Sequence, residues 1–198
     1  MTSKKNDSSP DILRMTKRHY RELLTLLPEG VGITDLSENL VFVNDAFANI
    51  IGYTVEELRG MSVFEFVSED DADKLRKESS ERQAGISSAY ELKLIRKDGK
   101  PITVRVSAVP WKNEKDEIVG AIAVLIDITK EKLAEQELQK LSLAVEQSPT
   151  SVVITDANAL IEYVNPRFSV LTGYSPDETI GKNPRILKSG LTPEDTYS

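Results

Sequence analysis

The chain has 198 residues, of which 39% are hydrophobic and 29% are charged, and its formal net charge is −7. That length suits one or two soluble domains, and the negative charge argues against nucleic acid as a partner because too few cations are present to neutralise phosphates. The sequence contains no cysteine, which excludes disulfides, thiolate metal sites and cysteine nucleophiles. It also fits a reducing cytoplasm, where we expect the protein to act.

The N-terminal region is predicted to contain a tail and one helix. Residues 1–9 are polar and are expected to be a disordered tail rather than a signal peptide. Residues 10–27 are expected to form an amphipathic helix with one apolar stripe. The stripe consists of Leu13, Tyr20, Leu24 and Leu27. The longest apolar run, residues 119–126, is far shorter than the roughly 20 residues that a membrane-spanning helix needs.

An internal repeat organises the rest of the chain. Residues 30–60 align with residues 151–181 without a gap. The identical pairs include Thr34/Thr155, Asp35/Asp156, Val43/Val164, Asn44/Asn165, Phe47/Phe168, Gly52/Gly173, Tyr53/Tyr174 and Gly60/Gly181. We interpret the repeat as a duplicated domain. The first copy, residues 28–129, is expected to be complete, and the second, residues 148–198, is expected to contain only the N-terminal half.

Within each copy, short runs rich in β-branched residues predict two strands joined by a turn, as at residues 31–34 and 40–43. Asn44 and Asn165 then stand where a helix N-cap is expected. A capping box is predicted to start a second short helix in each copy. The two boxes are Thr54 to Glu57 and Ser175 to Glu178.

Only the first copy continues beyond these helices. Ser68 is predicted to start a helix that runs to about Ser80. Three strands are then expected at residues 90–96, 102–110 and 118–127, with a hairpin turn at residues 97–100. The order of elements predicts an α+β domain built on an antiparallel sheet.

The last predicted strand is apolar on both faces, so one face must be covered by something other than the domain core. The N-terminal helix and a partner subunit are both candidates. Residues 130–147 are predicted to form a connector helix with the apolar spacing of a short coiled coil. Its seam is Ala134, Leu138, Leu141 and Val145. We therefore expect a homodimer formed through the N-terminal and connector helices.

Four segments together resemble the PAS domain family: residues 43–47, 52–60, 96–99 and 127–129. The resemblance implies a five-stranded antiparallel sheet with helices on one face, enclosing a small pocket. It also implies a sensory input module of a larger signalling protein, such as a sensor histidine kinase, with the output domain elsewhere.

The resemblance also implies a route for the signal. Asp127 and Thr129 match the family's junction between the last strand and the following helix, and Leu138 and Leu141 would carry the signal along the connector. Asp127 also suits a second interpretation, in which it only caps the connector helix.

The identity of a cofactor stays open at this point. A haem pocket of the oxygen-sensor kind needs an axial imidazole, and the only histidine, His19, lies in the N-terminal helix among cationic residues, where a surface position is expected. A flavin adduct of the light-sensing kind needs a cysteine, which this chain lacks. Non-covalent flavin is possible in a completed second domain, where residues 181–190 resemble flavin-binding relatives and Asn183 is the candidate contact.

The sequence leaves four candidate functions to compare. The first is a sensory relay module, and the second is a flavin redox sensor. The third is an enzyme, such as a kinase fragment. It is disfavoured because the chain has no glycine-rich phosphate loop. With one histidine and no cysteine, the chain also cannot assemble a catalytic pair of a nucleophile and a histidine base. The fourth is a ligand-free dimerisation spacer, which the bulky residues of strands 92–110 favour.

Overall fold

The computed structural model describes the backbone of residues 17–187 and the side chains of residues 22–187. The predicted tail and the first part of the predicted N-terminal helix lie outside the described residues. The chain divides into two compact units between Lys132 and Leu133, and each unit is described separately.

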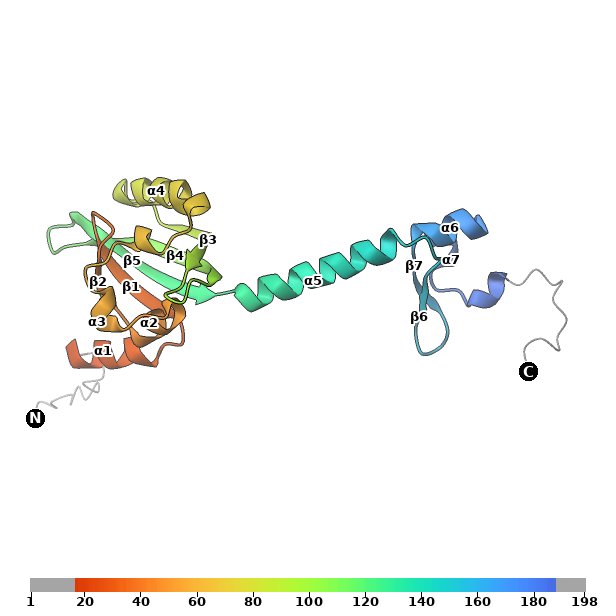
Figure 1. Ribbon diagram of the computed structural model, residues 1–198, viewed down its shortest axis with the longest axis horizontal. Helices are drawn as coiled ribbons and strands as arrows, with labels where there is room; N and C mark the ends of the chain where they lie inside the picture. The colour runs from red at the N-terminus through yellow and green to blue at the C-terminus, as the bar shows by residue number, and fades with distance from the viewer. Residues whose placement is uncertain (1–16, 188–198) are drawn as a thin grey trace, which may run out of the picture. The chain divides into compact units, whose positions relative to one another are not determined.

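The first unit is built on a five-stranded antiparallel sheet with the order β2-β1-β5-β4-β3 (Figure 1). Its strands are β1 (Gly30–Asp35), β2 (Leu40–Val43), β3 (Ser88–Ile95), β4 (Pro101–Lys112) and β5 (Ile118–Asp127). Its helices are α1 (Lys17–Leu26), α2 (Asp45–Ile51), α3 (Val55–Leu58), η2 (Val63–Glu65) and α4 (Glu69–Gln83). The predicted α+β fold with a five-stranded antiparallel sheet is confirmed.

The predicted helix caps are present in both repeats. Asn44 accepts a hydrogen bond from the Phe47 amide at 2.9 Å, and Thr54 and Glu57 form the reciprocal capping box of α3. Gly52 ends α2 in the left-handed region, with φ of 82°, where residues with a β-carbon are strained. Local sequence signals therefore determine where these short helices begin and end.

The start of α4 differs from the expectation in its chemistry. Ser68 occupies the N-cap position, but its side chain makes no capping hydrogen bond. The carboxylate of Asp71 instead accepts from the backbone amide of Lys93 at 2.6 Å, which fixes the helix start against β3. The helix also continues past Ser80 to Gln83. Its last turn is held in place because Arg82 pairs with a buried carboxylate of the β1–β2 turn.

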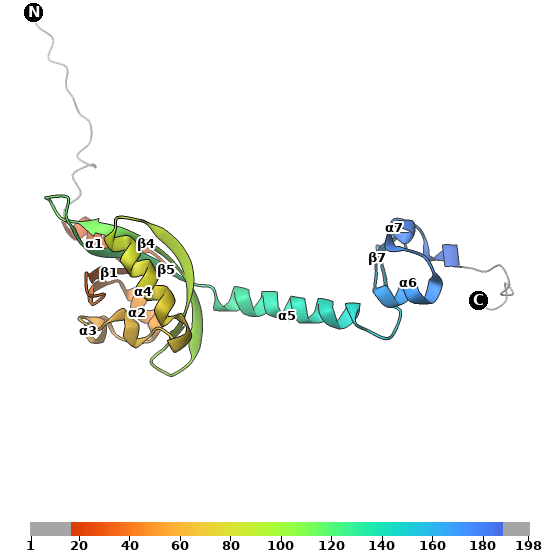
Figure 2. The ribbon, with the colours of Figure 1, turned by 90° about the horizontal axis from the view of Figure 1, so that it is seen from above.

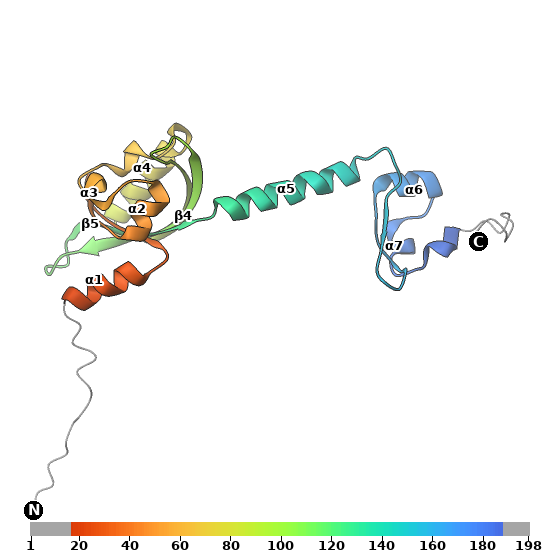
Figure 3. The same ribbon diagram turned by 60° about the horizontal axis from the view of Figure 1, so that its bottom comes forward.

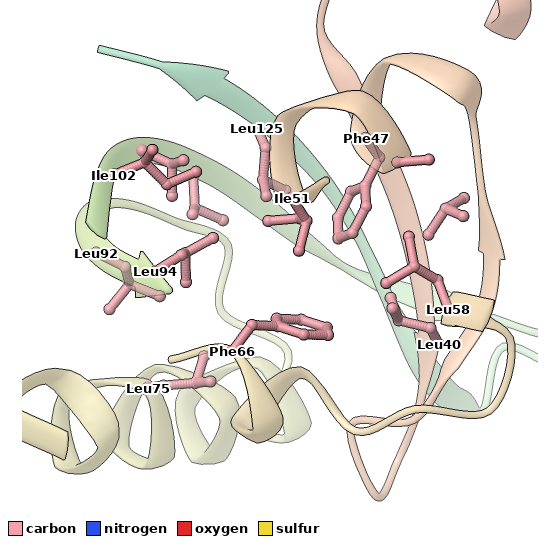
Figure 4. Packing of buried hydrophobic residues seen from close by; sticks show 14 of the residues in the cluster. Leu40, Phe47, Ile51, Leu58, Phe66, Leu75, Leu92, Leu94, Ile102 and Leu125 are labelled. Carbon is pink, nitrogen blue, oxygen red and sulfur yellow. The ribbon is translucent and has the colours of Figure 1, made fainter. Parts of the chain in front are cut away.

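The hydrophobic core lies between the sheet and the helices α2, α3 and α4 (Figure 4). Its largest members come from every one of these elements. They include Leu40, Phe47, Ile51, Leu58, Phe66, Leu75, Leu92, Leu94, Ile102, Val104 and Leu125. Each fully buried aliphatic or aromatic side chain contributes about 1.5–3 kcal/mol to folding, so this cluster is the main source of the unit's stability.

The opposite face of the sheet is only partly covered. Figures 2 and 3 show α1 on the other side of the sheet from α2 and α4. Val109 and Ile126 are nevertheless 45% and 42% exposed. Leu24 of α1 is half-buried, and Leu27, which directly follows α1, is exposed, whereas the side chains of the other two predicted stripe residues lie outside the described part. Which of the two candidates, α1 or a partner subunit, covers the rest of this face stays a prediction.

The second unit contains most of helix α5 (Thr129–Glu146), whose first turn belongs to the first unit, followed by a small repeat of the same elements. These elements are β6 (Val153–Thr155), β7 (Ile161–Val164), α6 (Pro166–Thr172), α7 (Pro176–Thr179) and η3 (Pro184–Leu187). Three buried apolar residues form its core: Ile161, Val164 and Phe168. Among the helices within residues 17–187, none has the length and apolar character that crossing a membrane would require.

Candidate functional site: an apolar cavity and a helix junction

A cavity of about 60 Å³ lies inside the first unit, between the inner face of the sheet and the helices. Its walls are almost entirely apolar, and they come from β1 to β5, η2 and α4 as well as α2. The apolar lining includes Leu40, Phe47, Val63, Phe66, Leu75, Leu92, Leu94, Val106, Ala108, Ala123 and Leu125. Such a space suits the apolar body of a small molecule.

One end of the cavity is polar. The carboxylate of Glu38 forms an ion pair with the guanidinium of Arg82 at 2.8 Å, and these two side chains are 10% and 4% exposed. Glu38 also accepts hydrogen bonds from the hydroxyls of Thr34, at 3.2 Å, and Ser79. Arg82 in turn donates to the Tyr90 hydroxyl at 2.9 Å. We call Glu38, Arg82 and Tyr90 the polar end of the cavity.

The electrostatics of the polar end favour a charged Arg82 and a neutral Tyr90. Burial opposes the charge of Arg82, but its interactions with Tyr90 and Glu38 outweigh this effect, so the pKa of Arg82 is raised. Burial also raises the pKa of Tyr90, although Arg82 opposes that shift. At neutral pH the Tyr90 hydroxyl therefore keeps its proton.

Glu38 has an unusual backbone conformation, with φ of 60° in the left-handed region. Its counterpart in the second repeat, Ala159, has the same φ of 60°. The turn thus imposes this conformation on both copies, at a cost of about 1–3 kcal/mol for a residue with a side chain. Only the first copy places a carboxylate there, and that carboxylate forms the polar end.

Glu38 and Arg82 were not foreseen from the sequence. The aligned turn offered one signal, since the second repeat has Ala159 where the first has Glu38. Arg82 offered none, because it sits among other charged residues in α4 and meets Glu38 only in three dimensions.

The junction between β5 and α5 contains the two residues expected to pass on a signal. Asp127 accepts hydrogen bonds from the Thr129 amide at 2.9 Å and from its hydroxyl at 2.6 Å. The Thr129 oxygen accepts from the Thr103 amide at 2.9 Å. Between them, Ile128 is 3% exposed and its amide donates to the Thr103 carbonyl. The start of α5 is thereby fixed to β4.

A third contact at the junction was not foreseen from the sequence. Glu91 of β3 accepts from Lys132, in the first turn of α5, at 3.0 Å, and lies 3.6 Å from Arg105 of β4. The hydrogen bond from Lys132 is the main reason why the pKa of Glu91 is lowered. The residues on either side of Glu91, Tyr90 and Leu92, both line the cavity. A single strand therefore contacts the cavity on one face and α5 on the other.

The repeated asparagines attach a helix to each repeat. The Asn44 side-chain amide donates to the Leu24 carbonyl of α1 at 2.9 Å. The Asn165 side-chain amide donates to the Val145 carbonyl of α5 at 3.0 Å. The N-cap residue that begins α2 or α6 thus also holds the last turn of the helix that precedes each repeat.

The other residues singled out from the sequence have simple surroundings. Leu138 and Leu141 are 69% and 56% exposed, and α5 has no buried residue. The Asn183 side-chain oxygen accepts from the Arg185 amide at 3.0 Å, and its role toward a flavin stays a prediction. The side chain of His19 lies outside the described residues. Within the described residues, no cluster of three or more potential ligands could hold a metal ion.

Comparison with known families gives two matches. Residues 28–130 match the family described as "PAS domain", and residues 139–197 match the family described as "PAS fold". Among solved structures, the PAS domain of a protein from Colwellia psychrerythraea is similar, with a TM-score of 0.53 and 24% identity over 61% of this chain and 99% of that one.

Two curated relatives illustrate the range of similar proteins. A nitrogen fixation regulatory protein of Klebsiella pneumoniae is 45% identical over 53 residues, which cover 27% of this chain and 11% of that protein. A blue-light-activated histidine kinase of Brucella anthropi is 27% identical over 133 residues, which cover 65% of this chain and 27% of the kinase. The chain thus spans about a tenth to a quarter of the length of these two relatives.

Proposed function

The chain belongs to the PAS domain family, and from that premise we propose that it is a sensory input module whose first cavity is coupled to helix α5. Similarity to a histidine kinase supports the sensory role. In this proposal, occupation of the cavity changes the position of β3 and β5, and these strands change how firmly the first turn of α5 is held.

The alternation of residues along β3 carries the proposal. Tyr90 and Leu92 line the cavity, while Glu91 between them binds Lys132 of α5. Successive side chains of a strand point to opposite faces, so a shift of the strand at the cavity also moves the Glu91 carboxylate. The next two steps of the relay would be Asp127 and Thr129, since Leu125 of β5 lines the same cavity.

We further propose that the signal continues along α5 to an output domain such as a kinase, within a homodimer. The exposed apolar seam of α5 supports a helix–helix contact, and the attachment of its last turn to Asn165 supports transmission into the second repeat. The chain itself is proposed to have no catalytic role.

Hydrogen–deuterium exchange tests the coupling without knowledge of the ligand. Ala108 is buried and lines the cavity, so Ala108→Val places extra volume there. We expect faster exchange at the amides of residues 129–132. The matched control is Ala89→Val, at an exposed position of β3. If Ala108→Val alters exchange around the cavity but leaves residues 129–132 unchanged, the proposed coupling is wrong.

A second candidate is a non-covalent flavin sensor formed by a completed second domain. One observation favours it. The side-chain oxygen of Asn183 accepts a hydrogen bond from the Arg185 amide, but its side-chain NH₂ group has no hydrogen-bond partner within the described residues. That NH₂ group would be available to a heterocycle. The test is an absorption spectrum of this chain and of a version extended to complete the second repeat. Flavin bands in the extended version alone would support this candidate, and a colourless extended version would rule it out.

A further inference from the structure

We propose that the outer edge of β3 is a self-complementary interface for β3 of a second copy of this chain, and that residues 66–74 cover this edge. We call residues 66–74 the edge cover. The inference goes beyond the proposed sensory function and does not depend on what occupies the cavity.

β3 is the last strand of the sheet and pairs with β4 alone. Its register with β4 is unbroken, so alternate residues of β3 direct their backbone groups away from β4. These residues are Ala89, Glu91, Lys93 and Ile95. Their side chains lie on the outer face of the sheet, opposite the core residues Leu92 and Leu94. An edge of this kind is a template to which another strand can add.

The first part of the edge cover binds the edge through its backbone. The amide of Ile95 donates to the carbonyl of Phe66 at 2.7 Å, and the amide of Ser68 donates to the carbonyl of Lys93 at 3.0 Å. A single antiparallel bridge between these two contacts joins the cover to β3. This part of the cover therefore runs beside β3 as the beginning of a sixth strand would.

The second part of the edge cover is helical and binds the edge through side chains. The Asp71 carboxylate accepts from the Lys93 amide at 2.6 Å, and the Lys74 ammonium donates to the Glu91 carbonyl at 2.7 Å. Both contacts are exposed, whereas Leu75, the next residue of α4, is 4% exposed and belongs to the core. These side-chain contacts can therefore detach while α4 stays packed.

A second β3 would need the same backbone groups. In an antiparallel pair that places Glu91 opposite Lys93 of the second copy, the amides and carbonyls of these two residues form the hydrogen bonds between the strands. The edge cover binds three of these four groups. No acceptor for the fourth, the Glu91 amide, is found in the described part of the chain. The cover and a second copy are thus alternative occupants of one edge.

The charges on β3 favour this one register. Glu91 faces Lys93 of the second copy, Lys93 faces Glu91, and Ala89 faces Ile95 across a twofold axis. A shift of two residues in either direction would instead place Glu91 opposite Glu91 or Lys93 opposite Lys93, and like charges directly opposite each other destabilise a pair of strands. Since each Glu91 already lies near Lys132 and Arg105 of its own chain, the charges act mainly by excluding the shifted registers.

Removal of the side-chain contacts tests the cover in the full chain. We expect Asp71→Ala with Lys74→Ala to sediment as a larger species than the native chain at equal concentration. The Glu91 amide should also exchange about tenfold more slowly with deuterium when the concentration of this variant is raised, because it gains an acceptor only in the pair. The matched control is Asp70→Ala with Lys77→Ala, which removes one acid and one base from exposed positions of the same helix. It should behave as the native chain does.

A second variant guards against loss of the fold. Ser68 has a φ of −62°, which proline adopts, so Ser68→Pro with Lys74→Ala frees the carbonyls of Lys93 and Glu91 and keeps Asp71. A native-like thermal transition identifies which variants are folded. If every folded variant of the two sediments as the native chain does and leaves the exchange at Glu91 independent of concentration, the proposal is wrong.

Charge reversal in the uncovered variant identifies the interface. Glu91→Lys or Lys93→Glu alone places like charges opposite each other and should weaken the association about tenfold. The two reversals together restore opposite charges and should restore the association. Damage to the contact of Glu91 with Lys132 would not be repaired by Lys93→Glu, so restoration points to the strand pair. Equal association of all three reversed variants would mean that the second copy binds another surface, and would overturn the proposal.

Discussion

Lys132 in the first turn of α5 donates a 3.0 Å hydrogen bond to Glu91 of β3, directly between the two β3 residues that line the cavity. Both side chains are 38% exposed, so the contact adds little to global stability. Its importance is positional, because it joins the strand to the helix that leaves the unit.

Replacing Glu91 by Gln should loosen the first turn of α5 without unfolding the first unit. The amide oxygen of glutamine lacks the charge that pairs with Lys132. We expect faster hydrogen–deuterium exchange at residues 129–132 and an unchanged thermal midpoint. Lys112→Gln is the control, because it breaks another exposed ion pair, between Lys112 and Asp116 at 2.9 Å, which does not involve α5. Slower or unchanged exchange in Glu91→Gln would show that the pair does not hold the helix.

The same contact predicts a dependence on pH. The pKa of Glu91 is lowered in the folded chain, chiefly by its hydrogen bond to Lys132. A lowered folded pKa means that the stabilisation is fully present above the unfolded pKa and is lost as the pH falls through the folded value. Exchange at residues 129–132, corrected for its intrinsic pH dependence, should therefore be constant from pH 8 down to about 5 and rise below the ordinary range of a glutamate, near 4.3. The Glu91→Gln variant should lack this rise.

Much of the first unit could be predicted because its signals are local. Asn44, Thr54 and Glu57 mark the starts of helices, and each forms its capping hydrogen bond with a residue less than four positions away. The second repeat shows the same pattern, which strengthens the prediction. The second function of Asn44, holding the Leu24 carbonyl, could not be read in the same way because its partner lies twenty residues away.

The polar end of the cavity could not be predicted for the same reason. Glu38 and Arg82 are 44 residues apart, and each sits in a segment where charged side chains usually face solvent. Ser68 is the opposite case, because a local sequence signal was present but its expected contact did not form. The Ser68 side chain makes no capping hydrogen bond, and the Asp71 carboxylate accepts from the Lys93 amide of β3. Tertiary contacts decided both cases.

The hydroxyl of Thr129 should stabilise the junction. It accepts from the Thr103 amide and donates to Asp127, so Thr129→Val leaves a partly buried amide without its partner. We expect a loss of about 1–2 kcal/mol in the free energy of unfolding, measured with urea. Thr129→Ser keeps the hydroxyl and should retain most of this energy. Equal losses in the two variants would assign the effect to packing of the methyl group.

The buried pair of Glu38 and Arg82 should be strongly non-additive. Removing one partner leaves a buried charge, so Glu38→Leu and Arg82→Met alone should each cost about 3–5 kcal/mol. The double variant should cost much less than the sum, because no charge is left unpaired and apolar side chains fill the space. Urea unfolding of the three variants gives the coupling energy. A double variant as unstable as the sum of the two would mean that the pair is not coupled in the folded chain.

The seam of α5 predicts self-association through this helix. Leu138 and Leu141 are 69% and 56% exposed in the isolated chain, and burying such residues against a second helix is what stabilises a coiled coil. Leu138→Asp with Leu141→Asp should therefore shift the chain toward monomer in sedimentation experiments, at an unchanged thermal midpoint of the first unit.

The matched control for this variant adds the same two charges outside the seam, as Gln136→Asp with Gln139→Asp. It should associate as the native chain does, because both positions lie on the faces of α5 that a two-helix contact leaves in solvent. If both variants weaken association equally, net charge is responsible. If neither does, the exposed outer face of the sheet at Val109 and Ile126 becomes the better candidate for the interface.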